Sequence, residues 1–442
     1  MSISSAPRLS FGIGMICACL GWTFPALADT SVHVGIHRHL HQPNYWGEPA
    51  TAAGRPKQSQ YGQDSQALKD AGQAYYGDTI QHPEVLLVGG NDSVFGNNDK
   101  QQAYQANIKK SIGAMTSSDA GMTISYSGAL QRNLWSFGRY SQSGFSPTWN
   151  ADNVTAYNWK TSQGNSRAAV LGQTYHHAFT PLLPKSALRK EIEMHRERTR
   201  KSWGLASDMS DQSRGFWPIE LAFSEHLIPV LAEYGYQWVM IPNSHLARTC
   251  PNYMDALAQP SPGAELKADP PNRADQLGPT VPLDQWYGAN RDTYGNVFPV
   301  PFSYQLHKAK FVDPETGTET KMTIVPQCDY HGYQSGYGTV GWTYIDGKIA
   351  QYNDPNQPCL VMLTNDGENY WGGGNSFWNE FAPNFMNEAA SHGKKAITIG
   401  DFVALHPAPE NDVVHVEDGS WLAADQGSPQ FYRWLEPPRR IS

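Results

Sequence analysis

The stretch Gly215–Leu246, GFWPIELAFSEHLIPVLAEYGYQWVMIPNSHL, contains two strand-like runs with an amphipathic helical segment between them. The first apolar run ends in Glu220. A helix is expected from an N-cap at Ser224 to Gly235, because glycine suits the left-handed residue that follows a helix. Residues 236–241 have the β-branched and aromatic content of a buried strand. We therefore expect a βαβ unit whose first strand delivers a carboxylate at its C-terminal end, where (β/α) barrels place catalytic groups.

The composition is that of an acidic globular protein rich in aromatic residues. The 442 residues carry a formal net charge of −8, and 40% of them are hydrophobic. A chain of this length can hold one large α/β barrel or two to three average domains. Without a basic footprint, nucleic acid is not expected as a partner. The 14 Trp and 22 Tyr residues suit stacking on sugar rings, or equally the filling of a large core and its rim.

The first 28 residues have the pattern of a secretion signal. A positive residue, Arg8, precedes a mostly apolar run over 11–24, and ALA at 26–28 is a small-residue cleavage site. The apolar run is short and broken by glycine, which argues against a membrane-spanning helix. We expect cleavage before Asp29, a secreted or periplasmic protein, and no membrane contact after cleavage.

The predicted mature chain consists of a catalytic region over 29–405 and a C-terminal segment over 406–442 that completes the cleft. Within the first region, an insertion around 248–344 is rich in Pro, Asn, Gly and Tyr, and we expect it to be mostly irregular apart from a β-hairpin at 303–326. Three cysteines remain after cleavage: Cys250, Cys328 and Cys359. In an oxidising compartment they allow one disulfide with one thiol left over, and the sequence does not choose the pair.

Strands and helices alternate along the chain. Lys185–Trp203 is the clearest helix, with alternating charges on one face and Leu188, Ile192 and His195 on the other. Further strands are expected at 31–36, 122–126, 168–171 and 359–364, and several of them end in polar clusters. This alternation favours a parallel α/β barrel over a doubly wound sheet.

The first polar cluster is HRHLHQP at 37–43, which follows a predicted strand. In an extended chain His37, His39 and His41 share one face, so their three imidazoles can converge. Three interpretations stay open: a zinc site, contacts with a polar substrate, or histidines that only satisfy buried backbone groups.

Three more clusters follow predicted strands. One is the His176–His177 pair, which carries little information alone. The next is Glu220 with the nearby Trp217. Because an isolated buried charge is very costly, this glutamate must be solvated at a cleft or paired. The last is NDGENYWG at 365–372, in which Asp366 follows a hydrophobic strand.

Asp366 is therefore expected at the same barrel edge as Glu220. Two carboxylates at one barrel mouth meet the requirement of glycoside hydrolysis, since one attacks or binds water while the other, protonated, releases the leaving oxygen. Their environments can separate the two pKa values enough to assign these roles. Aromatic residues in neighbouring Gly-rich loops are candidates for a rim that stacks on glucan, or for ordinary packing: Tyr330, Tyr333, Tyr337, Trp342, Tyr370 and Trp371.

The ordered set of these motifs resembles glycoside hydrolase family 57. The matching pieces are HLHQP at 39–43, HAFTPL at 177–182, GFWPIE at 215–220 and DGEN at 366–369, and GSW at 419–421 is similar to the family's last motif. Each piece is weak alone, whereas their order and spacing over residues 32–425 are specific.

The resemblance implies an incomplete (β/α)7 TIM-like barrel with a short helical C-terminal segment, and a retaining mechanism on α-linked glucans or maltooligosaccharides without a cofactor. By position, Glu220 matches the nucleophile and Asp366 the acid/base. His41 and His177 match histidines that line the subsite of the attacked sugar, and Trp217 lies beside the nucleophile. The other candidates for substrate contacts are His39, Glu368, Tyr370, Trp371 and Trp421.

Three alternatives remain beside an amylase-like hydrolase. A 4-α-glucanotransferase would use the same site. A metal-dependent amidohydrolase or polysaccharide deacetylase would use the residues His37, His39, His41, His177, His245 and Asp366, but would leave Glu220 without a role. A non-catalytic glucan-binding protein is disfavoured because both carboxylates are present. The oligomeric state cannot be read from the sequence.

Overall fold

Seven parallel strands form a barrel in the part of the chain that the structure describes. The computed structural model describes residues 31–45, 48–49, 56–57, 95, 98–141, 144–258, 270–289, 296–336, 338, 340–367 and 377–421. The barrel strands are β1 (His33–Leu40), β4 (Met122–Tyr126), β5 (Ala168–Val170), β6 (Gly215–Phe216), β7 (Trp238–Pro242), β11 (Glu319–Gln327) and β12 (Leu360–Asp366).

The barrel is built from two parallel sheets joined at two narrow junctions. One sheet has the order β12-β1-β4-β5 and the other contains β11-β7-β6. Beyond β5, Gly172 forms a parallel bridge to Phe216. On the other side, the Cys328 N–H donates to the Met362 carbonyl at 3.0 Å, between the end of β11 and β12. The predicted incomplete (β/α)7 barrel is therefore confirmed.

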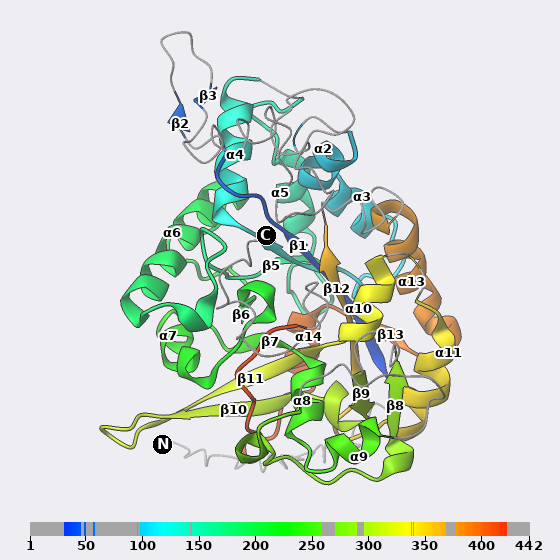
Figure 1. Ribbon diagram of the computed structural model, residues 1–442. Coiled ribbons are helices and arrows are strands. Elements are labelled where there is room, and N and C mark those ends of the chain that lie inside the picture. The colour runs from blue at the N-terminus through cyan, green and yellow to red at the C-terminus, as the bar shows by residue number, and fades with distance from the viewer. Residues whose placement is uncertain are drawn as a thin grey trace, which may run out of the picture.

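Helices cover the outside of the barrel and its C-terminal end. Figure 1 shows α6 and α7 along one flank, α11 and α13 along the other, and α2 to α5 beyond the C-terminal ends of β1 and β12. No helix in the described ranges is long and apolar enough to cross a membrane. The helices are α2 (Asn98–Gln105), α3 (Asn107–Gly113), α4 (Gly128–Arg139), α5 (Ala151–Asn158), α6 (Lys185–Trp203), α7 (Ile228–Glu233), α8 (Asn243–Thr249), α9 (Tyr253–Leu257), α10 (Asp329–Gly336), α11 (Trp342–Tyr344), α13 (Ala382–Glu388) and α14 (Ile399–Leu405).

Helix α6 has the bounds that the sequence predicts. Its buried face includes Leu188, Ile192 and His195, which recur at helical spacing. The helix ends at Gly204, whose φ of 69° lies in the left-handed region that glycine adopts without a steric penalty. Local pattern and packing agree here, so the sequence alone defines this element.

The opening βαβ unit exists, but its helix is shorter than expected. Ser224 does not cap it; its hydroxyl pairs with His226 Nδ1 at 2.8 Å, and a 3-10 turn precedes α7. Gly235 has a φ of 79°, as the sequence predicts. The first strand also stops early, at Phe216, so Glu220 lies beyond the strand rather than at its end.

The insertion is more regular than the sequence indicates. The hairpin β10 (His307–Val312) with β11 is confirmed, and it projects from the barrel in Figure 1. However, α8, α9 and a second hairpin of β8 (Trp286–Ala289) and β9 (Asn296–Pro299) replace the irregular region predicted over 248–296. Likewise α10 replaces a predicted loop, where Asn365 Nδ2 donates to Ser335 Oγ at 2.9 Å. Tertiary contacts stabilise these short segments despite their weak helical or strand pattern.

The remaining described strands are short. They are β2 (Glu48–Pro49), β3 (Pro56–Lys57) and β13 (Lys395–Ala396), of which β13 pairs with β1. The disulfide that the sequence allows is not formed among the described cysteines: Cys250, Cys328 and Cys359 are buried free thiols, and burial raises the pKa of each. These thiols pack as small hydrophobic side chains.

Candidate active site

The C-terminal ends of three adjacent strands bring the first motif and the last carboxylate together. In the sheet His39 is paired in register with Asp366 on one side and with Ser125 on the other. The Gly367 N–H donates to the His39 carbonyl at 2.6 Å, which continues the pairing of β12 with β1 past Asp366. Residues in register on neighbouring parallel strands project to the same face. Asp366 and His39 therefore share one edge of the barrel mouth.

The side chains of His37 and His39 in β1, and of His41 directly after it, point to one side, as the sequence predicts. The ring of His37 stacks on Trp217 with centroids 4.5 Å apart, and the ring of His39 lies 5.1 Å from the same indole. His41 stacks on His177 at 3.7 Å with an angle of 10° between the rings. This packing places the HLHQP motif against the HAFTPL and GFWPIE motifs at the barrel mouth.

Two serines that the sequence reasoning missed hold these rings. Ser125 Oγ lies 3.0 Å from His37 Nε2 and 2.7 Å from His39 Nδ1. Ser127 Oγ lies 2.9 Å from His41 Nδ1 and also accepts the Leu130 N–H at the start of α4. The sequence feature that could have indicated them is SYS at 125–127, at the end of a predicted strand. Its two serines are two residues apart, so in an extended chain their hydroxyls lie on the same face.

The histidines are neutral near neutral pH. Burial lowers the pKa of His37, His39 and His41 well below the usual value, with a smaller contribution from neighbouring positive groups. Burial lowers the pKa of His177 to about 3. Each ring therefore carries one N–H, and the fixed contacts decide which nitrogen holds it.

Glu220 lies on a tight turn in an uncommon backbone conformation. Its φ is 56° and that of Leu221 is 50°, both in the left-handed region. Such non-glycine residues cost on the order of 1–3 kcal/mol each and persist only where surrounding structure holds them. The Leu221 N–H donates to Pro218 O at 2.9 Å, and the Ala222 N–H to Ile219 O at 2.9 Å. The turn aims the Glu220 side chain into the mouth, where it remains 21% exposed.

Trp421 holds the Glu220 carboxylate from the C-terminal segment. Its indole Nε1–H donates to Glu220 Oε2 at 2.7 Å, and its backbone N–H donates to the Glu220 carbonyl at 3.0 Å. The indole also meets the Trp217 ring edge-on at 6.0 Å. The structure thus brings the predicted residue Trp421 to the site, and its visible role is to orient the carboxylate.

The C-terminal segment itself is anchored by buried charged groups. Arg248 donates to both Glu417 oxygens, with Nη2 to Oε1 at 3.0 Å, and both side chains are buried. The two ring nitrogens of His245 lie 3.2 Å from the Glu417 carbonyl and 2.9 Å from the Ser420 carbonyl. The sequence offers His245 only as a metal ligand, whereas the structure uses it to support the segment that carries Trp421.

His177 lies close to the Glu220 carboxylate, and His39 connects His177 to the strand that carries Asp366. The Nε2 atoms of the two histidines are 2.8 Å apart, and His177 Nε2 is 4.0 Å from Glu220 Oε1. His39, in turn, is the register partner of Asp366. Glu220, Asp366, His39, His41, His177, Trp217 and Trp421 are all brought to the same region, and three other candidates, Glu368, Tyr370 and Trp371, lie outside the described residues.

The loop that carries His177 is fixed by Glu191 of α6, another residue that the sequence reasoning missed. His177 has a φ of 61°. Glu191 accepts the His176 backbone N–H at 2.8 Å and contacts His176 Nδ1 at 2.7 Å. This contact raises the pKa of His176. The Glu191 carboxylate on α6 therefore holds His176 in place, directly before His177 with its left-handed backbone.

The predicted aromatic rim is only partly available. Trp342 is stacked on Phe385 at 4.4 Å and on His392 at 4.5 Å, and its Nε1–H donates to Glu388. Its ring is used for packing, which is the second of the two roles that the sequence left open. The ring of Tyr330 likewise meets Tyr344 edge-on at 6.0 Å. Tyr337 and the side chain of Tyr333 lie outside what the structure describes.

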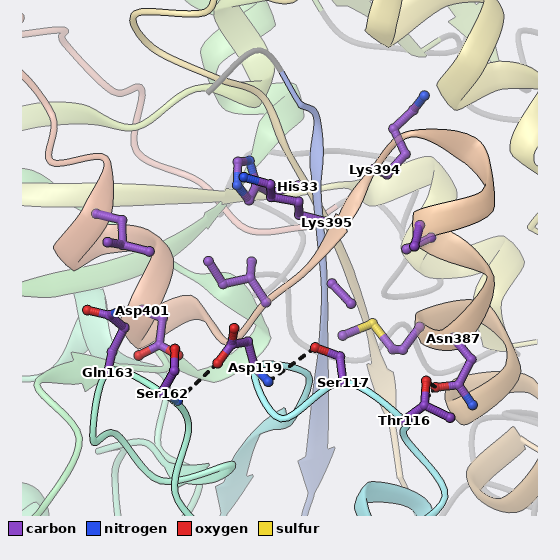
Figure 2. Close-up of a pocket in the computed structure, with 16 residues that line it drawn as sticks. His33, Thr116, Ser117, Asp119, Ser162, Gln163, Asn387, Lys394, Lys395 and Asp401 are labelled. Carbon is purple, nitrogen blue, oxygen red and sulfur yellow. Dashed lines mark hydrogen bonds between the residues drawn. The ribbon is translucent and has the colours of Figure 1, made fainter. Parts of the chain in front are cut away.

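A separate hollow lies at the opposite end of the barrel. Figure 2 shows it between the starts of β1 and β13 and the loops before β4 and β5; its volume is about 370 Å³. Asp119 accepts the Ser162 N–H there at 2.9 Å, and Asp401 accepts Asn165 Nδ2 at 2.6 Å. None of the candidate catalytic residues lines this hollow.

The described residues also bear on the metal alternative. Within the ranges that the structure covers, no three His, Cys, Asp or Glu side chains are grouped so that they could hold a metal ion. The rings of His37 and His39 are instead engaged by Ser125 and Trp217. The proposed ligand His245 lies under the C-terminal segment.

Several known proteins are similar to this chain in sequence or in fold. A model described as glycosyl hydrolase family 57 matches residues 91–269. A curated α-amylase from Niallia circulans is 29% identical in an alignment of length 441 that covers 93% of this chain and 32% of that protein. Both matches make the chain similar to members of glycosyl hydrolase family 57.

Solved structures show the same fold for this chain. The 4-alpha-glucanotransferase from Thermococcus litoralis aligns with a TM-score of 0.50 and 11% identity over 89% of this chain and 43% of its own. An exo-type maltose-forming amylase from Pyrococcus sp. ST04 aligns with a TM-score of 0.53 and 10% identity over 92% of this chain and 56% of its own. The chain spans about a third of the length of the curated relative.

Proposed function

We propose that this chain is a retaining glycoside hydrolase that acts on α-linked glucans, with Glu220 as the nucleophile and Asp366 as the acid/base. The observation that carries the proposal is the Glu220 carboxylate. It is held by Trp421 on a strained turn, 4.0 Å from His177, in a cluster that also contains the register partner of Asp366. The match of residues 91–269, which include Glu220, to the model of glycosyl hydrolase family 57 supports the assignment of the nucleophile.

The proposed reaction has two steps. Glu220 attacks the anomeric carbon while protonated Asp366 gives its proton to the glycosidic oxygen, so that the glycosidic bond breaks and a glycosyl-enzyme ester forms. In the second step Asp366 takes a proton from water while the water oxygen attacks the anomeric carbon. The ester bond to Glu220 breaks, and the carboxylate of Glu220 is restored. Retention requires the two carboxyl groups to lie about 5–5.5 Å apart. His39, His41, His177 and Trp217 would contact the sugar bound between them.

Replacement of each carboxylate tests these roles. Glu220→Gln and Asp366→Asn should each abolish release of reducing ends from maltoheptaose, while binding of maltooligosaccharide persists. Glu233→Gln is a matched control, because this glutamate lies on the outer surface and pairs with Arg189 at 2.9 Å. The initial product of the wild type should carry the α-anomer, as read by proton NMR. Wild-type rates for Glu220→Gln would show that another group attacks.

The same site also fits a 4-α-glucanotransferase, since a sugar hydroxyl can replace water in the second step. The Thermococcus litoralis structure of that name supports keeping this alternative. A product profile from maltoheptaose separates the two activities: products longer than the substrate indicate transfer, and shorter ones alone indicate hydrolysis. We favour α-1,4 hydrolysis because the curated relative is named an α-amylase.

Two further expectations are part of the proposal. A metal-dependent deacetylase would lose activity on treatment with a chelator, whereas the carboxylate mechanism predicts unchanged rates. Residues 1–28 are proposed to be a secretion signal, and the N-terminal sequence of the exported protein should then begin at Asp29. A non-catalytic glucan-binding protein would bind maltooligosaccharides without releasing any reducing ends.

A further inference from the structure

Ser125 connects two imidazoles beneath the candidate active site. Its hydroxyl oxygen lies 3.0 Å from His37 Nε2 and 2.7 Å from His39 Nδ1, and the side chain is fully buried. The other nitrogen of His39, Nε2, lies 2.8 Å from His177 Nε2. The four side chains therefore form one hydrogen-bonded chain that begins in the barrel interior and ends 4.0 Å from Glu220 Oε1.

Only two proton arrangements satisfy this chain. A hydroxyl carries a single hydrogen, so Ser125 donates to one ring and accepts from the other. Each neutral imidazole likewise has one donor and one acceptor nitrogen. Once the hydrogen of Ser125 is placed, the tautomers of His37, His39 and His177 all follow. The chain donates either from His37 towards His177 or in the opposite direction.

The surroundings of His37 favour the first direction. Its Nδ1 is buried and has no hydrogen-bond partner among the described residues. In the reverse direction this nitrogen would carry the hydrogen, and a buried N–H without an acceptor is rare in proteins. In the forward direction the hydrogen is on Nε2 and reaches Ser125, so that only an acceptor nitrogen is left unsatisfied. Burial also lowers the pKa of all three rings, which disfavours an imidazolium that would donate from both nitrogens.

We propose that Ser125 is a positioning residue that fixes the tautomers of His39 and His177 at the site of the proposed glycosidase. In this arrangement His39 donates through Nε2, and His177 accepts at Nε2 and keeps its hydrogen on Nδ1. His177 therefore gives no proton to Glu220 Oε1 and places no positive charge beside it. The carboxylate remains available for attack while His177 offers its Nδ1–H as a donor. This inference rests on the proposed role of Glu220.

Removal of the hydroxyl tests the proposal by kinetics. Ser125→Ala should lower kcat on maltoheptaose by about 3- to 10-fold, the change in rate that corresponds to the loss of one neutral hydrogen bond. KM should change little, whereas the melting temperature should fall because two buried ring nitrogens lose their hydrogen-bond partner. Thr123→Val is the matched control: Thr123 lies two residues earlier on the same face of β4, and its buried hydroxyl has no hydrogen-bond partner in the described residues. This variant should retain the wild-type kcat.

A direct measurement of the tautomers makes the test independent of activity. In wild-type protein with ¹⁵N-labelled histidine, the His177 signals should show hydrogen on Nδ1 and those of His39 hydrogen on Nε2. Assignment follows from Asn replacements of each ring. Ser125→Ala should give a mixture of tautomers at His39. Hydrogen on His177 Nε2 in the wild type, or an unchanged kcat in Ser125→Ala, would overturn the proposal. If Glu220→Gln stays active while the tautomers are as expected, the assignment of the nucleophile fails instead.

Discussion

The contact between Trp421 and Glu220 leads to a quantitative prediction. Trp421→Phe removes the indole Nε1–H that donates to Glu220 Oε2 at 2.7 Å but keeps an aromatic ring against Trp217. A hydrogen bond to a charged group contributes about 1.5–3 kcal/mol. Its main effect here is to hold one orientation of the carboxylate on a turn that is itself strained. Since about 1.4 kcal/mol corresponds to a tenfold change in rate, kcat/KM should fall about 10- to 100-fold.

The assay is the release of reducing ends from maltoheptaose, with the melting temperature measured in parallel. Trp342→Phe is a close control, because the indole of Trp342 also donates to a glutamate, Glu388, at 3.0 Å but lies on the outer surface of the barrel. The control should keep the wild-type kcat/KM. The reasoning is refuted if Trp421→Phe is as active as the wild type, or if both variants lose activity equally.

Two predictions concern stability and pH. Glu191→Gln should lower the melting temperature and the kcat on maltoheptaose, because the Glu191 carboxylate clamps His176 beside the strained His177. Glu191 raises the pKa of His176, so the ion pair stabilises the fold fully below the usual histidine pKa and stops doing so as the pH rises through the raised pKa. The difference in melting temperature between Glu191→Gln and the wild type should therefore shrink over that rise in pH. A constant difference would contradict the ion pair. Arg248→Met should reduce the free energy of unfolding by about 3–5 kcal/mol in urea titrations, since it leaves the buried Glu417 charge unpaired. Arg248→Met with Glu417→Leu should recover most of that loss, and failure to recover would mean that the pair itself stabilises the fold.

Local sequence patterns predict the fold where each element is defined by its own residues. Helix α6 and the strands β1, β4 and β12 follow from apolar periodicity, and Gly204 and Gly235 end helices where left-handed residues are needed. The hairpin of β10 and β11 follows from its turn residues. By contrast, α10 and the hairpin of β8 and β9 have no clear pattern, because they are stabilised by contacts such as that of Asn365 with Ser335.

The candidate site is predicted unevenly for the same reason. The three histidines of the first motif share a face because extended backbone alternates, and this spacing is visible in the sequence. The partners Ser125, Ser127 and Glu191 belong to other strands and helices, so no local pattern indicates them. Trp342 is the converse case. Its place in a Gly-rich loop makes its ring a candidate for glucan stacking, but in the structure the ring is stacked on Phe385.

By itself, the sequence determined the kind of barrel, the order of its motifs and the two acids on which the proposed chemistry depends, because these follow from periodicity, strand ends and motif order. The tertiary structure decided how the site is held. It placed Glu220 on a left-handed turn, brought the Trp421 indole to its carboxylate and set the Ser125 hydroxyl between the rings of His37 and His39. These features depend on the approach of groups far apart in the chain, and the direction of a hydrogen bond is set only when both partners are in place.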